Sequence, residues 1–150
     1  MPSADFSSQA HAFARAAEGL GPRSLESFSM FYASECRFTD PFQAVIGRHR
    51  VLQIYQGMFD HLEAPCFRNV RVLGAVSEST REAMIGWEFE FALDKRSARQ
   101  SIAGCSRLIF NARGEIQEHI DYWDASQLMQ AMPVVGRLIA WLRQKIGRAH

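Results

Sequence analysis

Residues 83–93, AMIGWEFEFAL, decide the fold. In this stretch Trp87, Phe89 and Phe91 alternate with Glu88 and Glu90. Because successive side chains of a strand point to opposite faces, this alternation predicts a strand with one buried and one solvated face. The glutamates then form a solvated face, or a polar patch where two sheets meet in a dimer.

Three neighbouring segments show the same alternation, with a period of two residues. We expect strands over 67–76, 83–93, 100–110 and 115–124. The last two are joined by Asn111-Ala112-Arg113-Gly114. This is a hairpin turn in which glycine supplies the positive φ.

The chain before residue 65 has helical spacing instead. Apolar residues three and four apart predict a helix over 10–20 that ends at Gly21-Pro22, and a second helix from Ser24 with an apolar face reaching Tyr32. Asp40-Pro41 then breaks the chain, and a third helix is expected over 48–62. Helices followed by a meander of long strands predict an α+β fold, a strongly curved antiparallel sheet wrapped around a helix to leave a cone-shaped cavity.

Length and composition narrow the class of protein. A chain of 150 residues is expected to be a single domain, and a net charge of +1 gives no field for binding nucleic acid. The chain shows no apolar run near the ~18 residues of a membrane span and no signal-peptide core, so we expect a cytoplasmic protein. Cys36, Cys66 and Cys105 lack metal-ligand spacing, so reduced thiols are expected and no metal site.

Two motifs set ionisable side chains among aromatic ones, Arg37-Phe38-Thr39-Asp40-Pro41-Phe42 and His119-Ile120-Asp121-Tyr122-Trp123-Asp124. A carboxylate in an aromatic cavity loses hydration and becomes a stronger base. The motifs matter if the fold buries them together.

The chain resembles the nuclear transport factor 2-like superfamily, of the ketosteroid isomerase and polyketide cyclase (SnoaL-like) type. The resemblance rests on these two motifs, on Gly47-Arg48 before the third helix, and on Phe110 and Gly114-Glu115-Ile116 at the hairpin. The resemblance covers roughly residues 8–126. It implies a cone fold that serves isomerases, cyclases, dehydratases, epoxide hydrolases and non-catalytic binders.

The resemblance puts Asp40 at the position of the isomerase's catalytic aspartate, a base that moves a proton beside a ketone. The isomerase's two oxyanion donors are replaced by Ala16 and Ser106. Tyr32 and Tyr55 fall where family members keep supporting tyrosines. Without the oxyanion donors, steroid isomerisation itself is not expected.

His119 and Asp121 share a strand face with Trp123, which the family turns toward the cavity. We expect Asp40 as base, His119 as acid or electrophile and Asp121 as its orienter. The side chains expected to bind the substrate are Tyr32, Phe42, Tyr55, Phe59, Trp87, Phe89, Ser106 and Trp123.

The function predicted is therefore proton-transfer chemistry on a small apolar carbonyl compound, with no cofactor, because no phosphate loop or dinucleotide glycine pattern occurs. A non-catalytic binder of a hydrophobic ligand is the alternative, in which Asp40 only caps the turn at Pro41 and His119 only packs. A limonene-type epoxide hydrolase is a further alternative that would need Arg99 or Arg107 beside Asp121.

Residues 126–150 are predicted to be a C-terminal helical extension. Val134, Leu138 and Leu142 belong to an apolar stripe over 133–147, with basic residues mostly away from it. We expect this stripe to pack on its own domain or on the mate in a homodimer, rather than on a membrane.

Overall fold

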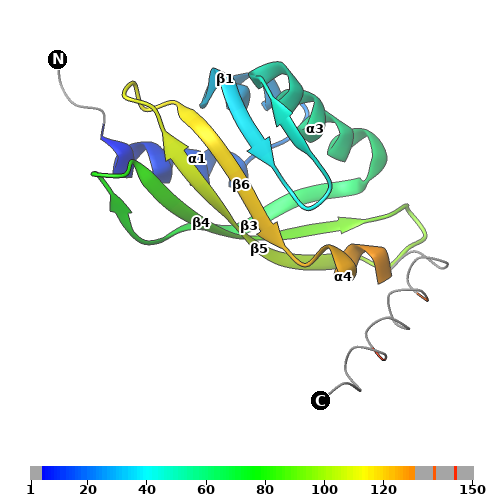
Figure 1. Cartoon of the computed structure of the whole chain (residues 1–150). Coiled ribbons are helices and arrows are strands. Elements are labelled where there is room, and N and C mark those ends of the chain that lie inside the picture. Colours follow the sequence, from blue (N-terminus) through cyan, green and yellow to red (C-terminus); the bar gives the residue numbers. More distant parts are fainter. Residues whose placement is uncertain (1–4, 131–136, 138–143, 145–150) are drawn as a thin grey trace.

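A computed structural model of the chain describes residues 5–130, together with residues 137 and 144. It has the expected α+β cone fold, with helices packed on a six-stranded, mostly antiparallel sheet in the order β2-β1-β6-β5-β4-β3 (Figure 1). The strands are β1 (Tyr32–Thr39), β2 (Ala44–Ile46), β3 (Glu63–Ser77), β4 (Glu82–Ala92), β5 (Gln100–Phe110) and β6 (Ile116–Trp123). The helices are α1 (Phe6–Glu18), α2 (Leu25–Ser29), α3 (Arg48–His61) and α4 (Ala125–Gln130).

The sheet departs from the antiparallel expectation at one pair of strands. β1 and β6 run parallel, with Phe38 paired to His119 and Thr39 to Ile120, while the other neighbours are antiparallel. This pairing joins the β1–β2 hairpin to the meander β3–β6, and Figure 1 shows the hairpin and α3 standing over the long strands. It also brings the two sequence motifs side by side.

The stretch that predicted the sheet forms β4 as expected. Trp87 and Phe91 are buried. The glutamates between them lie on the other face, where Glu90 accepts from Arg68 at 2.6 Å and Glu88 from Asn69 at 3.0 Å, both on β3. Residues 83–110, all of which the structure describes, contain strands and a turn but no helix.

The expectation that the second helix reaches Tyr32 is wrong. α2 ends at Ser29, and Tyr32 begins β1. The reason is a change of period, since Cys36 and Phe38 are buried while Arg37 and Thr39 are exposed. Because the apolar face of the strand begins close to the end of the apolar stripe of the helix, the sequence shows no boundary between the two elements.

Two helices cover the concave side of the sheet. α1 starts at Asp5, whose carboxylate accepts from the Ser8 backbone N–H at 3.1 Å, and it packs on β3 and β4. α3 buries Val51 and Tyr55. Met58 and Leu62 of its predicted apolar stripe are only partly buried, and both border a cavity.

The amphipathic helix predicted over 133–147 lies outside the described residues. In the part of the chain that is described, no helix is long and apolar enough to cross a membrane.

The wall of the cavity depends on a glycine. A Cβ built on Gly104 of β5 would lie 2.5 Å from Cη2 of the Trp87 indole, which lies across β5 at this point. Trp87 pairs with Gly104 in the β4–β5 register. The ring can take this position only because residue 104 has no side chain.

Gly104→Ala is expected to force Trp87 from its rotamer and to lower the free energy of unfolding by about 1–3 kcal/mol. Urea unfolding would measure the change. The matched control is Gly57→Ala in α3, where an added Cβ meets nothing within 4 Å. That variant should be more stable by up to about 1 kcal/mol, since alanine favours helix, and equal stability losses in both variants would contradict the packing argument.

Candidate active site

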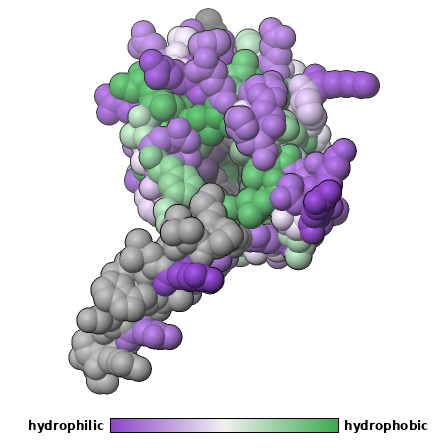
Figure 2. Space-filling view, turned by 90° about the vertical axis from the view of Figure 1, so that its right-hand side faces the viewer, coloured by the Kyte–Doolittle hydropathy of each residue, from purple (hydrophilic) through white to green (hydrophobic). Residues whose placement is uncertain are grey.

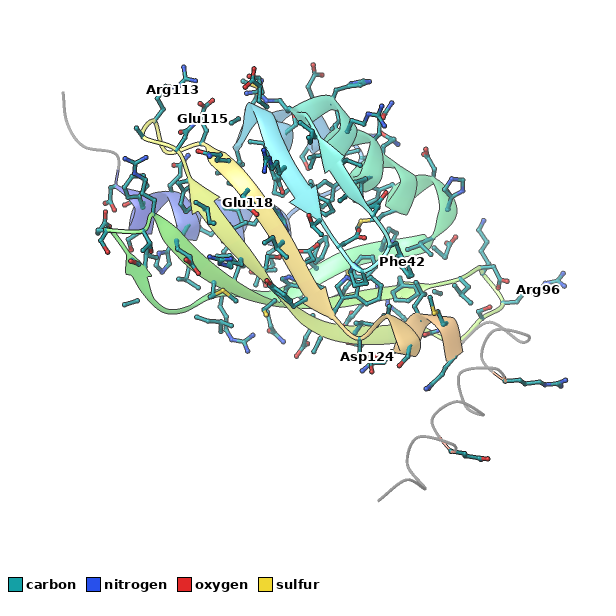
Figure 3. All side chains as sticks on the ribbon, viewed as in Figure 1. Phe42, Arg96, Arg113, Glu115, Glu118 and Asp124 are labelled. Atoms are coloured by element: carbon teal, nitrogen blue, oxygen red, sulfur yellow. The ribbon has the colours of Figure 1, made fainter. Side chains whose placement is uncertain are left out.

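The described residues enclose a cavity of about 290 Å³ between α3 and the concave face of the sheet. Figure 2 shows hydrophobic side chains gathered around a hollow in this face of the molecule. Figure 3 shows Phe42 near the start of α4, and its ring packs edge-on against Trp123, with centroids 5.4 Å apart. The lining includes eight aromatic side chains: Phe38, Phe42, Tyr55, Phe67, Trp87, Phe89, Phe91 and Trp123.

Polar groups are few in this lining. The two ionisable side chains other than Tyr55 are Asp40 and Asp121, and none of the described lining residues is Lys, Arg or His. In a low-dielectric cavity an uncompensated carboxylate repels an anion strongly. The cavity is therefore suited to a neutral or a cationic ligand.

Asp121 projects from β6 into this wall because of the β5–β6 register, which pairs it with Ser106. Its Oδ1 accepts two hydrogen bonds, from Ser106 Oγ at 2.5 Å and from His119 Nε2 at 2.6 Å. Trp87 Nε1 in turn donates to Ser106 Oγ at 2.9 Å. The carboxylate is thereby fixed in one orientation.

The other oxygen of Asp121 faces open space. Oδ2 has no hydrogen-bond partner among the described residues, and these residues contain no polar side-chain atom that is both buried and unpaired. Asp121 lines the cavity, and its unpaired Oδ2 is not buried. One oxygen is held and the other is free to accept a proton, the arrangement that a general base needs.

His119 lies behind Asp121 and not in the cavity wall. It is 1% exposed and is enclosed by Phe13, Phe38 and Tyr32, whose ring stacks on the imidazole at 5.8 Å. It lines only a void of about 20 Å³ on the inner side of Trp87 and Asp121. Both side chains were expected to face the cavity, but the structure places only Asp121 in the cavity wall and His119 behind it.

A chain of hydroxyl groups continues from the other nitrogen of His119. Tyr32 Oη lies 2.8 Å from Nδ1, and Tyr55 Oη lies 3.1 Å from Tyr32 Oη. Burial, with Tyr55 close by, raises the pKa of Tyr32 well above its usual value, and burial with the charge of Asp121 raises the pKa of Tyr55. Both phenols are therefore neutral hydrogen-bonding groups.

Asp40 also lines the cavity, but its carboxylate is engaged in a turn. Oδ1 accepts from the backbone N–H groups of Phe42 and Gln43 at 2.8 and 3.0 Å, and Oδ2 accepts from Gln43 Nε2 at 3.1 Å. This is the turn-capping alternative considered for Asp40, and it leaves fewer lone pairs for a ligand than Asp121 has.

The remaining predicted residues divide into two groups. Phe42, Tyr55, Trp87, Phe89 and Trp123 line the cavity, and Ser106 lines the inner void. Tyr32 and Phe59 line neither, because Tyr32 lies in the core beside His119 and Phe59 packs against the edge of the core. Sequence analysis missed Phe67 of β3, which packs against Trp87 at 5.6 Å, although its place at the start of a predicted strand was a usable signal.

The arginines required by the epoxide-hydrolase alternative lie elsewhere. Arg107 pairs with Glu82 at 2.7 Å, and Arg99 donates to the Ala64 carbonyl at 2.9 Å. Neither lines the cavity, so neither completes a relay with Asp121. The described residues also contain no group of three His, Cys, Asp or Glu side chains that could hold a metal ion.

The fold is of the nuclear transport factor 2-like, ketosteroid isomerase-like type. A family model described as a SnoaL-like domain matches residues 13–119, and the chain belongs to this family. No curated protein matches the chain.

Solved structures share the fold at low identity. A phenazine biosynthesis-related protein from Pseudomonas aeruginosa superposes with a TM-score of 0.69 at 5% identity, over 85% of this chain and 87% of the other. A protein from Xanthomonas campestris pv. campestris, provisionally named a polyketide cyclase, gives 0.68 at 14% identity, over 82% and 93%. A ketosteroid isomerase-like protein from Catenulispora acidiphila, solved in complex with trimethylamine, gives 0.64 at 13% identity, over 83% and 88%.

The two buried tyrosines predict how stability changes in alkali. An unfolded tyrosine ionises near pH ~10, whereas the raised pKa values of Tyr32 and Tyr55 keep them protonated in the folded chain. The two protonated tyrosines contribute fully to the free energy of unfolding below pH ~10. Above that pH the contribution is lost, by about 1.4 kcal/mol per pH unit for each tyrosine.

Urea unfolding at a series of pH values above ~10 would measure this slope. Tyr32→Phe should make this slope shallower by the share of one tyrosine, about 1.4 kcal/mol per pH unit. Tyr122→Phe is the control, because Tyr122 is 50% exposed on β6 and should leave the slope unchanged. Equal slopes in all three proteins would contradict the burial of Tyr32.

Proposed function

We propose that this protein catalyses proton transfer on a small, neutral, mostly apolar carbonyl compound, as an isomerase, cyclase or dehydratase does. The observation that carries the proposal is the Asp121 carboxylate, with Oδ1 fixed by Ser106 and His119 and Oδ2 open to an aromatic cavity. Family membership supports the class of chemistry.

The step assigned to Asp121 is removal of a proton from a carbon beside the carbonyl. Oδ2 takes the proton, the C–H electron pair becomes a carbon–carbon double bond, and the carbonyl π pair moves onto oxygen. Return of the proton to another carbon moves the double bond, and loss of a leaving group from the enolate gives a dehydration. The structure favours Asp121 over Asp40 as the base, since the turn already uses both oxygens of Asp40.

Deuterium exchange tests this proposal without the natural substrate. With 1-tetralone in D₂O, the protein should accelerate deuterium incorporation beside the carbonyl, followed by NMR. Asp121→Asn should lose this acceleration by at least ~10²-fold, because an amide cannot accept the proton. Asp40→Asn is the matched control, and it should keep most of the activity. Loss in Asp40→Asn with retention in Asp121→Asn would return the base to Asp40.

A binding protein for an organic cation is the second candidate. The observation favouring it is a cavity with eight aromatic rings, two carboxylates and no cationic side chain among the described lining residues. Aromatic faces attract substituted ammonium ions by about 0.5–2 kcal/mol. The Catenulispora acidiphila neighbour was solved with trimethylamine.

Calorimetric titration with benzyltrimethylammonium and its neutral isostere neopentylbenzene separates the two candidates. A cation binder should prefer the ammonium by about tenfold or more, and Asp121→Asn should remove the preference. The proton-transfer proposal expects the neutral compound to bind at least as well.

A further inference from the structure

The ring of Phe42 lies at the rim of the cavity. Phe42 is one of the lining residues, yet 50% of it is exposed to solvent. A residue that both lines a cavity and is half exposed borders the opening and not the closed end. Gln43 beside it is also exposed and also lines the cavity, as does the half-buried Leu128 of α4. The β1–β2 turn and α4 therefore form one border of the opening, where Figure 3 shows Phe42.

The closed end of the cavity lies at Trp87 and Asp121. Both residues also line the inner void of about 20 Å³, so they stand where the cavity borders the core. Trp123 follows Asp121 on the same face of β6, at a spacing of about 7 Å, and it also lines the cavity. Its ring meets that of Phe42 edge-on, with centroids 5.4 Å apart. The order from the closed end to the rim is therefore Asp121, Trp123 and Phe42.

Asp40 fixes the turn that carries Phe42. Its backbone closes the turn with Gln43 in both directions, through hydrogen bonds of 2.9 and 3.4 Å. Its carboxylate accepts from the backbone N–H groups of Phe42 and Gln43 and from the Gln43 side chain. All the hydrogen bonds described for the Asp40 side chain thus go to this turn. The backbone of Phe42 is held, while its half-exposed ring is free to change rotamer.

We propose that Phe42 determines the length of ligand that the cavity accepts, and that Asp40 is the positioning residue that holds the Phe42 ring across the rim. A ligand whose polar group lies beside Asp121 extends past Trp123 toward Phe42. A ligand that ends before the ring is covered by it and shielded from water. A longer ligand has to displace the ring from Trp123, which breaks the aromatic contact and leaves the end of the ligand in water.

This inference goes beyond the proposed function, since it concerns binding and holds whether or not Asp121 takes a proton. It also gives the Asp40 carboxylate a task that uses the hydrogen bonds it makes. A base needs a free oxygen, whereas a turn cap needs oxygens that accept from the turn, as those of Asp40 do.

The test is calorimetric titration of the full chain with phenyl alkyl ketones, from acetophenone to octanophenone. Each additional methylene that becomes buried should strengthen binding by about fourfold. In the wild type this gain should stop at the chain length that reaches Phe42. Phe42→Ala should weaken the short ketones, which lose their cover, and strengthen the long ones, which fill the place of the ring beside Trp123. The plots of affinity against chain length should therefore cross.

Ile46→Ala is the matched control for loss of an exposed apolar side chain. Ile46 lies on β2 of the same hairpin, is 65% exposed and is not among the described lining residues. Its plot should coincide with that of the wild type.

Two substitutions of Asp40 test its positioning role. Asp40→Ala removes the cap of the turn and should reproduce the crossing seen with Phe42→Ala. Asp40→Asn keeps an oxygen that accepts from the two backbone N–H groups, so it should keep the wild-type length limit.

Each part of the inference has an outcome that overturns it. Identical plots for the wild type and Phe42→Ala, or an equal loss of affinity for every ketone, would remove the role of Phe42. A wild-type plot for Asp40→Ala would remove the role of Asp40, and ketones that bind neither the wild type nor Phe42→Ala would overturn the inference as a whole. The proposed function fails separately: crossing plots without deuterium exchange that depends on Asp121 would overturn proton transfer and leave the length limit standing.

Discussion

The pairing of both nitrogens of a buried imidazole is the constraint on which the rest of the site depends. A polar ring removed from water is costly unless each polar atom finds a partner. His119 meets this condition with Asp121 on one side and Tyr32 on the other. Those partners come from β6 and β1, whose parallel pairing holds the two motifs together. The Asp121 carboxylate is oriented because the buried His119 imidazole needs a hydrogen-bond partner for Nε2.

The lining of the cavity combines many aromatic rings with a few oriented polar groups. Eight aromatic rings provide contact area but little directional information, and a stacked or edge-on ring tolerates many ligand shapes. The two carboxylates give the lining its negative charge, and Asp121 is held in one orientation by its hydrogen bonds to Ser106 and His119. A lining of this kind suits a family whose members share a fold but differ in ligand, since apolar contacts can change without disturbing the buried network.

Much of the fold could be predicted from the sequence because alternation and helical spacing are local signals. The four long strands and α3 follow the expected pattern closely, as AMIGWEFEFAL shows in β4. β1 was partly hidden, because Phe31 and Tyr32 continue the apolar face of α2 and no break separates the two. The parallel β1–β6 pairing depends on contacts between distant segments, which no local pattern encodes.

The sequence identified His119 and Asp121 as candidate residues, but it could not show which of the two reaches the cavity. His119 and Asp121 alternate with Ile120, so sequence puts them on one face, whereas the depth of each side chain depends on the curvature of the sheet and on the rings of Phe13 and Phe38. Similarly, the bond from Ser106 to Asp121 depends on the β5–β6 register.

The bare backbone at Gly104 has a consequence for what the cavity can hold. Trp87 lies in the space that a side chain at position 104 would occupy, and the same indole is part of the cavity wall. Any larger residue there would displace the ring, and the inner end of the cavity would change shape with it. Position 104 therefore limits the depth of the cavity, although residue 104 itself does not line it.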